Sequence, residues 1–120
     1  MNTLRTLSHS ATPLVLAIDG VINYDQKSEL SELLAHALAS DAPLVVVDLS
    51  NATFLDGFGV GLLRTFNRWL RSEDRRLAIV APQPYVQGVL SLAGLNSVMR
   101  VEASLEHALA GDVVLEEKTA

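Results

Sequence analysis

The stretch LVVVDLSNATFLDGFGVGLLRTFNRWL, residues 44–70, decides the fold of this chain. It opens with a short β-branched apolar run, residues 44–49, which is typical of a strand buried on both faces. From Asp56 onward, apolar residues recur at helical spacing: Leu62, Leu63, Phe66, Trp69 and Leu70. A strand followed by a glycine-rich helix start places unpaired backbone N–H groups at one rim of a sheet. Function is expected at that rim.

The residues before this stretch predict a strand. Residues 14–18 form it, because Pro13 precedes the apolar run and the Asp-Gly pair at 19–20 ends it. The apolar pair at 21–22 is interpreted as a continuation of the strand past a bulge. Residues 1–12 have no strong period and fit either an edge strand or a loose arm.

A helix is predicted to follow, with Asp25 as its N-cap. Its apolar residues follow the i, i+3, i+4, i+7, i+8 pattern of an amphipathic helix, and they are Leu30, Leu33, Leu34, Ala37 and Leu38. Pro43 marks the end of the break between this helix and the central strand.

The residues after the central stretch predict two further strand–helix units. Residues 77–80 form a short apolar strand, and residues 84–94 form a helix that starts at a proline and stops at a glycine. Residues 98–101 are the last predicted strand, and residues 104–111 hold a short helix begun by a serine and ended by a glycine. The state of the tail, residues 112–120, is left open.

The alternation of strands and helices implies crossover connections and a largely parallel sheet. The run VVVDLSNATFLDGFGVGLL, residues 45–63, resembles the STAS domain, the fold of bacterial anti-sigma factor antagonists. In that family an apolar strand ending in Asp-Leu-Ser is followed by an Asp-Ser-Ser-Gly-type turn and a helix. Residues 14–38, 75–95 and 98–109 resemble the family's other strand–helix units in the right order.

The resemblance implies an α/β, STAS-like fold with a mixed, mostly parallel sheet of four or five strands and about four helices. It covers approximately residues 14–110. We therefore expect residues 1–120 to form a single STAS-like domain with its core at about 14–110 and a tail at 112–120.

The turn departs from the family pattern at the position that matters most. In the family's antagonists, the residue just before the glycine of the turn is the serine that the anti-sigma kinase phosphorylates. That position is Phe58 here, and Gly57 replaces the neighbouring serine. Neither residue has a hydroxyl group that could accept a phosphate, whose charge of nearly −2 would change binding. The usual phosphorylation switch is therefore expected to be missing.

The composition excludes several classes of function. The chain has 120 residues, no cysteine and a formal net charge of −5, so thiolate metal sites and disulfides cannot form and a nucleic acid is not the expected partner. The apolar runs fall short of the roughly 18 residues needed to span a bilayer, so neither membrane insertion nor a signal peptide is expected. A cytoplasmic protein is the resulting expectation.

Two other kinds of site could lie at the same rim, a dinucleotide-binding loop and a Mg²⁺ site. The glycines at 57, 59 and 61 do not match the G-x-G-x-x-G spacing of a dinucleotide loop, and turn geometry with close packing explains them better. The aspartates Asp19, Asp48 and Asp56 follow or end strands, where they could bind Mg²⁺ for phosphoryl transfer or act as turn and helix caps. Capping is favoured, with Asp56 as the cap of the central helix, so no catalytic residue, metal or cofactor is expected.

Basic and histidine residues give weaker signals. Arg64, Arg68, Arg71 and Arg75 fall at i, i+4, i+7 and i+11, which indicates either a solvated helix face or a docking ridge for an acidic partner. The three histidines lack metal-ligand spacing and are expected at the surface; they are His9, His36 and His107.

The leading hypothesis is a non-enzymatic anti-sigma factor antagonist that binds an anti-sigma factor of the serine kinase type. The expected contact residues are Asp56, Gly57, Phe58, Gly59, Arg64 and Arg68. Phe58 is either a cover for the core or an exposed anchor for the partner. Control is expected through abundance or through another site such as Ser50 or Thr53, and a homodimer is compatible with this interpretation. Two alternatives are an accessory subunit of a lipid-transport ABC complex or stress-signalling assembly, and a nucleotide-binding or Mg-dependent phosphoryl-transfer domain.

Overall fold

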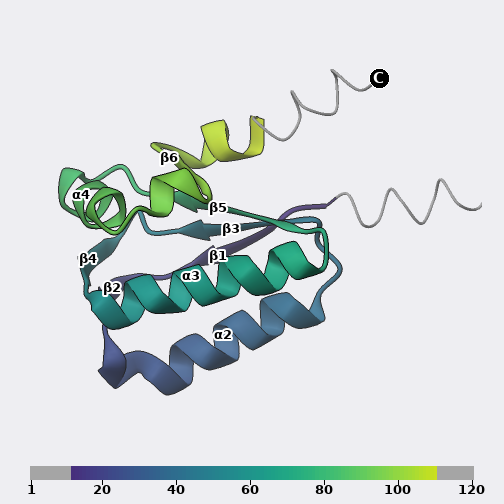
Figure 1. Ribbon diagram of the computed structural model, residues 1–120, viewed down its shortest axis with the longest axis horizontal. Helices are drawn as coiled ribbons and strands as arrows, with labels where there is room; N and C mark the ends of the chain where they lie inside the picture. The colour runs from purple at the N-terminus through teal and green to yellow at the C-terminus, as the bar shows by residue number, and fades with distance from the viewer. Residues whose placement is uncertain (1–11, 111–120) are drawn as a thin grey trace, which may run out of the picture.

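The computed structural model describes residues 12–110. Four strands form one parallel sheet in the order β1-β3-β5-β6: β1 is Leu14–Ala17, β3 is Leu44–Asp48, β5 is Arg76–Val80 and β6 is Arg100–Glu102. Two short strands, β2 (Gly20–Ile22) and β4 (Ala52–Leu55), form a second parallel pair beyond the carboxyl ends of β1 and β3. Figure 1 shows both sheets edge-on.

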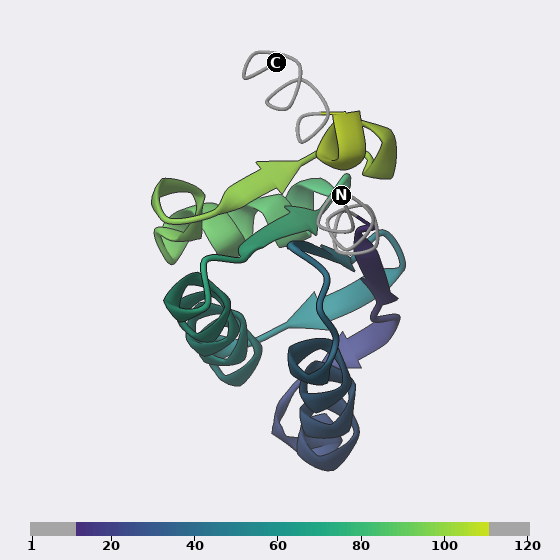
Figure 2. The ribbon, with the colours of Figure 1, turned by 90° about the vertical axis from the view of Figure 1, so that its right-hand side faces the viewer.

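The helices cover both faces of the main sheet. On one face lie α2 (Lys27–Ala39) and α3 (Gly57–Ser72), which run side by side (Figures 1 and 2). The helix α4 (Pro84–Leu92) follows β5, and a short helix at residues 105–110 covers the opposite face. Two single-turn 3-10 helices complete the described chain: η1 is Tyr24–Gln26 and η2 is Leu95–Ser97.

The core follows from the two-residue period of β3, whose neighbouring side chains point to opposite faces. Val45 and Val47 join the large core beneath α2, α3 and α4. Leu44 and Val46 join a smaller core that Ala108 and its helix cover. All four of these β3 side chains are 0% exposed, as expected for a strand buried on both faces. The predicted fold class, a mostly parallel sheet with four helices, is confirmed.

The structure corrects three local predictions. Residues 52–55 are a strand and not only a connector, and residues 20–22 pair with them after a register shift instead of continuing β1. Asn23 is the N-cap of η1 and accepts a hydrogen bond from the Asp25 N–H, and Gln26 is the N-cap of α2, so Asp25 caps neither helix. The last strand begins at Arg100 because residues 95–97 form η2 first.

Candidate functional site

The site is built around the start of α3, where the carboxyl end of β4 meets the helix. Asp56 has an extended backbone, and its Oδ1 accepts a hydrogen bond of 3.0 Å from the Gly59 N–H. The Asp56 N–H donates to the Ile22 carbonyl at 3.3 Å, which joins the cap to β2. The predicted capping role of Asp56 is confirmed. The Asp56 side chain satisfies one of the backbone N–H groups that have no partner in the first turn of a helix.

Of the three glycines at this helix start, Gly59 is the one that packing requires. Gly59 lies against the side chains of Leu55 and Ile22, and a Cβ atom there would come closer to Leu55 than real side-chain contacts allow. Gly57 and Gly61 have open space where a Cβ would stand. Close approach of α3 to the strand pair β2–β4 therefore explains Gly59, whereas the close packing expected for all three glycines is not found at Gly57 and Gly61.

Phe58 combines the two roles that the sequence left open. Its side chain is partly buried and packs against the edge of the large core. Its ring also meets the ring of Tyr24 edge to face, with centroids 5.4 Å apart and an angle of 81° between the planes. Tyr24 is 62% exposed, and the Lys27 Nζ lies 5.4 Å from its ring centroid. Phe58 is therefore a fixed side chain at the margin of an exposed aromatic surface.

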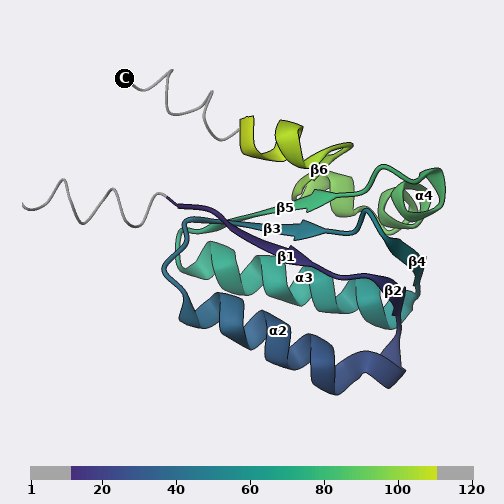
Figure 3. The ribbon, with the colours of Figure 1, turned by 180° about the vertical axis from the view of Figure 1, so that it is seen from behind.

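A second aromatic pair lies at the same end of the molecule. The rings of Phe54 on β4 and Tyr85 on α4 are stacked, with centroids 6.4 Å apart and an angle of 22° between the planes. Phe54 is 40% exposed and Tyr85 is 48% exposed. Figure 3 shows β2, β4, α4 and the start of α3 gathered at this end. We call the region formed by Tyr24, Phe54, Tyr85 and residues 56–58 the turn surface. Gly59, expected from the sequence to be among the contact residues, is buried beneath it.

Polar side chains hold the loop between β3 and β4 in place beneath the turn surface. The Asp48 Oδ1 accepts hydrogen bonds from the Ser50 N–H at 2.9 Å and from the Ser50 Oγ at 2.5 Å. The Gln83 Nε2 donates to the carbonyls of Leu49 at 3.1 Å and Ala52 at 3.2 Å, and it also contacts the Ser50 carbonyl. Gln83 immediately precedes α4, so it ties that helix to the loop.

The three aspartates considered for a metal site have separate local environments. Asp48 accepts hydrogen bonds from Ser50, Asp56 caps α3, and Asp19 is exposed in the segment after β1. Within residues 12–110, no group of three His, Asp or Glu side chains is arranged to hold a metal ion. The geometry gives the phosphoryl-transfer alternative no support. His36 and His107 are exposed, while His9 lies outside the described residues.

The arginines do not form the single ridge that their spacing indicated. Arg64, Asn67 and Arg71 lie on the flank of α3 that faces η2, since Arg64 Nη2 donates to the Ala93 carbonyl at 2.8 Å and Arg71 Nη1 donates to the Val98 carbonyl at 3.1 Å. Phe58 lies on the other flank, toward η1 and α2. The structure therefore places Phe58 and Arg64 on opposite flanks of α3, with exposed Arg68 between them on the outer face.

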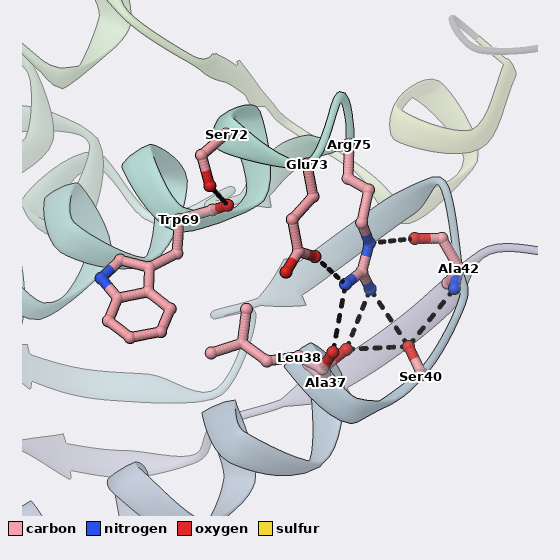
Figure 4. A network of polar contacts seen from close by, with 8 residues as sticks. All are labelled: Ala37, Leu38, Ser40, Ala42, Trp69, Ser72, Glu73 and Arg75. Carbon is pink, nitrogen blue, oxygen red and sulfur yellow. Dashed lines mark hydrogen bonds and ion pairs between the residues drawn. The ribbon is translucent and has the colours of Figure 1, made fainter.

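Arg75 is a structural residue, so its assignment to the exposed stripe is wrong. The helix α3 ends at Ser72, and the Arg75 side chain turns inward, where the residue is 8% exposed. Its guanidinium donates to the carbonyls of Ala37 at 2.9 Å and Ala42 at 2.7 Å (Figure 4). Arg75 therefore joins the end of α2 to the connection between α3 and β5. The C-terminal ends of these two helices lie at the opposite end of the molecule from β2 and β4 (Figure 1).

With this fold and site, the chain can be compared with known proteins. The family model of the STAS domain matches residues 5–108, so the chain belongs to the STAS domain family. It is similar to the anti-sigma-F factor antagonist RsfB of Mycobacterium tuberculosis, with 27% identity over 109 residues that cover 91% of this chain and 88% of RsfB.

Two solved structures share the fold. A crystal structure of an anti-sigma factor antagonist from Mycobacterium paratuberculosis superposes with a TM-score of 0.76 at 25% identity, covering 81% of this chain and 82% of that chain. The structure of the Bacillus cell fate determinant SpoIIAA in the phosphorylated form gives a TM-score of 0.62 at 21% identity, covering 82% and 88%. In residues 12–110, no helix is both long enough and apolar enough to cross a membrane.

Sequence reasoning missed three members of the turn surface: Tyr24, Phe54 and Tyr85. A signal was available, since the chain has only six aromatic residues and four of them lie in residues 24–85 outside the apolar stripe of the central helix. A buried aromatic residue usually belongs to a strand or helix with a regular apolar pattern. An aromatic residue that stands alone beside turn residues is therefore a candidate for the surface. The sequence does not show that β2 pairs with β4, and this pairing brings the segments together.

Proposed function

We propose that this protein is a non-enzymatic, cytoplasmic anti-sigma factor antagonist whose turn surface binds an anti-sigma factor of the serine kinase type. The single observation that carries the proposal is the exposed aromatic surface at the capped start of α3. Four aromatic rings meet there in two pairs, and three of them are at least 40% exposed. Large exposed aromatic side chains are the residues that most often anchor protein interfaces.

Family membership and similarity to named antagonists support the choice of partner. RsfB is named an anti-sigma-F factor antagonist, and the Mycobacterium paratuberculosis structure is of an anti-sigma factor antagonist. Both cover more than four fifths of this chain, including the turn. The proposed contact residues are Asp56, Gly57 and Phe58, joined by Arg64 and Arg68 where the partner extends along α3, while the buried Gly59 positions the turn.

We further propose that phosphorylation of the turn does not control this protein. SpoIIAA has been solved in a phosphorylated form, whereas residues 57 and 58 here have no hydroxyl group. The ring of Phe58 is held against Tyr24 and the edge of the core. The turn therefore presents the same surface at all times, instead of one that phosphorylation changes. The protein is then constantly competent to bind, and its abundance or a modification elsewhere sets its effect.

The test uses the purified anti-sigma factors of the source organism and calorimetry. The unaltered protein binds one of them, Phe58→Ala weakens that binding at least about tenfold, and Leu92→Ala leaves it unchanged. Leu92 is the matched control because it is apolar, 92% exposed and on the far side of α4 from the core. Binding to none of the anti-sigma factors would contradict the proposal.

A second variant tests the missing switch. Incubation of the unaltered protein with the bound kinase and ATP leaves its intact mass unchanged, and Phe58→Ser gains one phosphate and then loses affinity, because a dianionic group now stands at the contact. Phosphate mapped to residues 50–65 of the unaltered protein would reject the claim that this turn is unregulated.

A further inference from the structure

A groove lined by arginines runs between α3 and the segment that contains η2 and the start of β6. It consists of two adjoining hollows of about 320 and 290 Å³. Both are lined by Asn67, Arg71 and Val98; Arg64 and Arg68 line the first hollow, and Arg76 and Arg100 line the second. We call this feature, defined by those seven residues, the arginine groove. It lies on the flank of α3 opposite Phe58, so it is distinct from the turn surface.

The guanidinium groups in the groove are held in place by backbone carbonyls. Arg64 donates to the Ala93 carbonyl at 2.8 Å, and Arg71 donates to the Val98 carbonyl at 3.1 Å. A guanidinium has five N–H donors, so both arginines retain donors for a ligand. Arg100 is engaged elsewhere, because its Nε donates to Glu102 and its Nη2 donates to the carbonyls of His107 and Ala108 on the opposite face of the sheet. Because the carbonyls already fix Arg64 and Arg71, binding an anion costs less side-chain entropy than it would for free arginines.

Positive charge gathers along the α3 side of the groove. Among residues 12–110, no carboxylate lines either hollow. Arg100 pairs with the Glu102 carboxylate at 3.4 Å, so the charge of interest is that of Arg64, Arg68 and Arg71. The whole chain has a net charge of −5, so this concentration of positive charge runs against its composition. Local charge of one sign in a cleft steers and orients a ligand of the other sign.

The length of the groove selects among anionic ligands. Arg64 and Arg71 lie seven positions apart on α3, which is about 10 Å along the helix axis. One phosphate or carboxylate group cannot reach donors at both ends. A row of carboxylates on a polypeptide can, because side chains on one side of a segment repeat every 5–7 Å or so.

We propose that the arginine groove binds an acidic segment of the protein partner, with its carboxylates paired to Arg64, Arg68 and Arg71. The identity of that partner rests on the proposed function: it is the anti-sigma factor that also contacts the turn surface. Exposed Arg68 lies between the two surfaces, so the partner passes over the outer face of α3. The aromatic contact supplies affinity, and the acidic segment supplies orientation and fast association.

The first test measures the groove without the partner. A fluorescein-labelled hexaglutamate peptide is titrated with the full chain and followed by anisotropy, with hexaglutamine as the neutral probe. Arg71→Gln weakens hexaglutamate binding about fivefold or more, since a charge-assisted contact is lost. Ser28→Glu, which changes the net charge by the same amount at an exposed position on α2, changes it less than about twofold.

Several outcomes of this test overturn the proposal. Equal weakening by Arg71→Gln and Ser28→Glu shows a net-charge effect without a groove. Tighter binding of a twelve-nucleotide thymidine strand than of hexaglutamate assigns the groove to a phosphate polymer. Tighter hexaglutamate binding by Glu116→Gln/Glu117→Gln shows that the chain's own acidic end competes for the groove. Thermal unfolding of each variant confirms that it is folded.

The second test separates this inference from the proposed function. Binding of the anti-sigma factor is measured with Phe58→Ala and with Arg71→Gln at two salt concentrations. The proposal expects both variants to weaken binding, and the salt dependence to fall only in Arg71→Gln. If Phe58→Ala alone weakens binding, the groove proposal is rejected and the antagonist function stands. If hexaglutamate binds but no anti-sigma factor does, the antagonist function and the partner's identity fail, while the groove's preference for acidic peptides stands.

Discussion

The ring of Phe58 meets the ring of Tyr24 edge to face, with centroids 5.4 Å apart, at the turn residue just before Gly59. The same ring packs against the edge of the large core. Phe58 therefore joins η1 to the start of α3 and gives this turn a tertiary contact.

This contact predicts a measurable coupling between the two aromatic residues. Tyr24→Ala, Phe58→Ala and the double variant form a cycle whose coupling free energy is expected to be about 0.5–1.5 kcal/mol in urea unfolding, the range for edge-to-face pairs. The stacked pair of Phe54 and Tyr85 offers a parallel cycle, with centroids 6.4 Å apart. Strict additivity of the Tyr24 and Phe58 effects would show that the rings do not interact in solution.

The two helical glycines Gly59 and Gly61 are expected to respond in opposite directions to alanine. In an open helix position, Gly→Ala stabilises by about 0.5–1 kcal/mol, and a Cβ at Gly61 meets nothing within 4 Å. At Gly59 the added Cβ is forced against Leu55 and the Ile22 backbone, so the same substitution destabilises by about 1–3 kcal/mol. Chemical denaturation of both variants measures the difference. Stabilisation by Gly59→Ala would mean that α3 lies further from the strand pair than described.

The cap at Asp56 gives a third prediction. Asp56→Ala removes the acceptor for the Gly59 N–H and is expected to lower the free energy of unfolding by about 1 kcal/mol. Asp56→Ser preserves a side-chain acceptor at the same place and recovers most of the loss. The comparison is made by urea unfolding at neutral pH. If the serine variant is as unstable as the alanine variant, the carboxylate acts by its charge at the helix start and not by its hydrogen bond.

The elements with strong periodic patterns could be read from the sequence. The central strand, the helix that follows it and the Asp56 cap were all predicted, because buried apolar runs and helix starts have local signatures. The strand β4 was not, since its residues Ala52–Leu55 become a strand only by pairing with β2, and β2 lies thirty or so positions earlier. Local propensity carries no information about such a partner.

The dependence on tertiary contacts also explains why only part of the candidate site was predicted from the sequence. Helical spacing placed Arg64, Arg68 and Arg71 near one another, but only the tertiary structure shows that Arg64 and Arg71 face η2 while Phe58 faces η1. Spacing also assigned Arg75 to the same stripe by assuming that the helix continued. The chain instead turns at Asp74, which has a left-handed backbone with φ of 60°, and this reversal directs Arg75 inward.

That buried arginine carries the last prediction, which concerns stability alone. Arg75 makes hydrogen bonds to three carbonyls near the end of α2, at Ala37, Leu38 and Ala42, and to the Glu73 carboxylate at 2.9 Å (Figure 4). The Ala37 carbonyl also accepts from the Ser40 N–H and Oγ, but the Leu38 and Ala42 carbonyls lose the guanidinium as their donor. Arg75→Met is therefore expected to cost about 3 kcal/mol of unfolding free energy.

Lysine serves as the informative comparison, because it keeps the charge but lacks the planar arrangement of donors. Arg75→Lys is expected to recover less than half of the loss, whereas Arg68→Met, at an exposed position of α3, changes stability by less than about 0.5 kcal/mol. Urea unfolding of the three variants measures these values. Full recovery with lysine would show that charge next to Glu73, and not the hydrogen bonds to α2, is what holds this end of the molecule together.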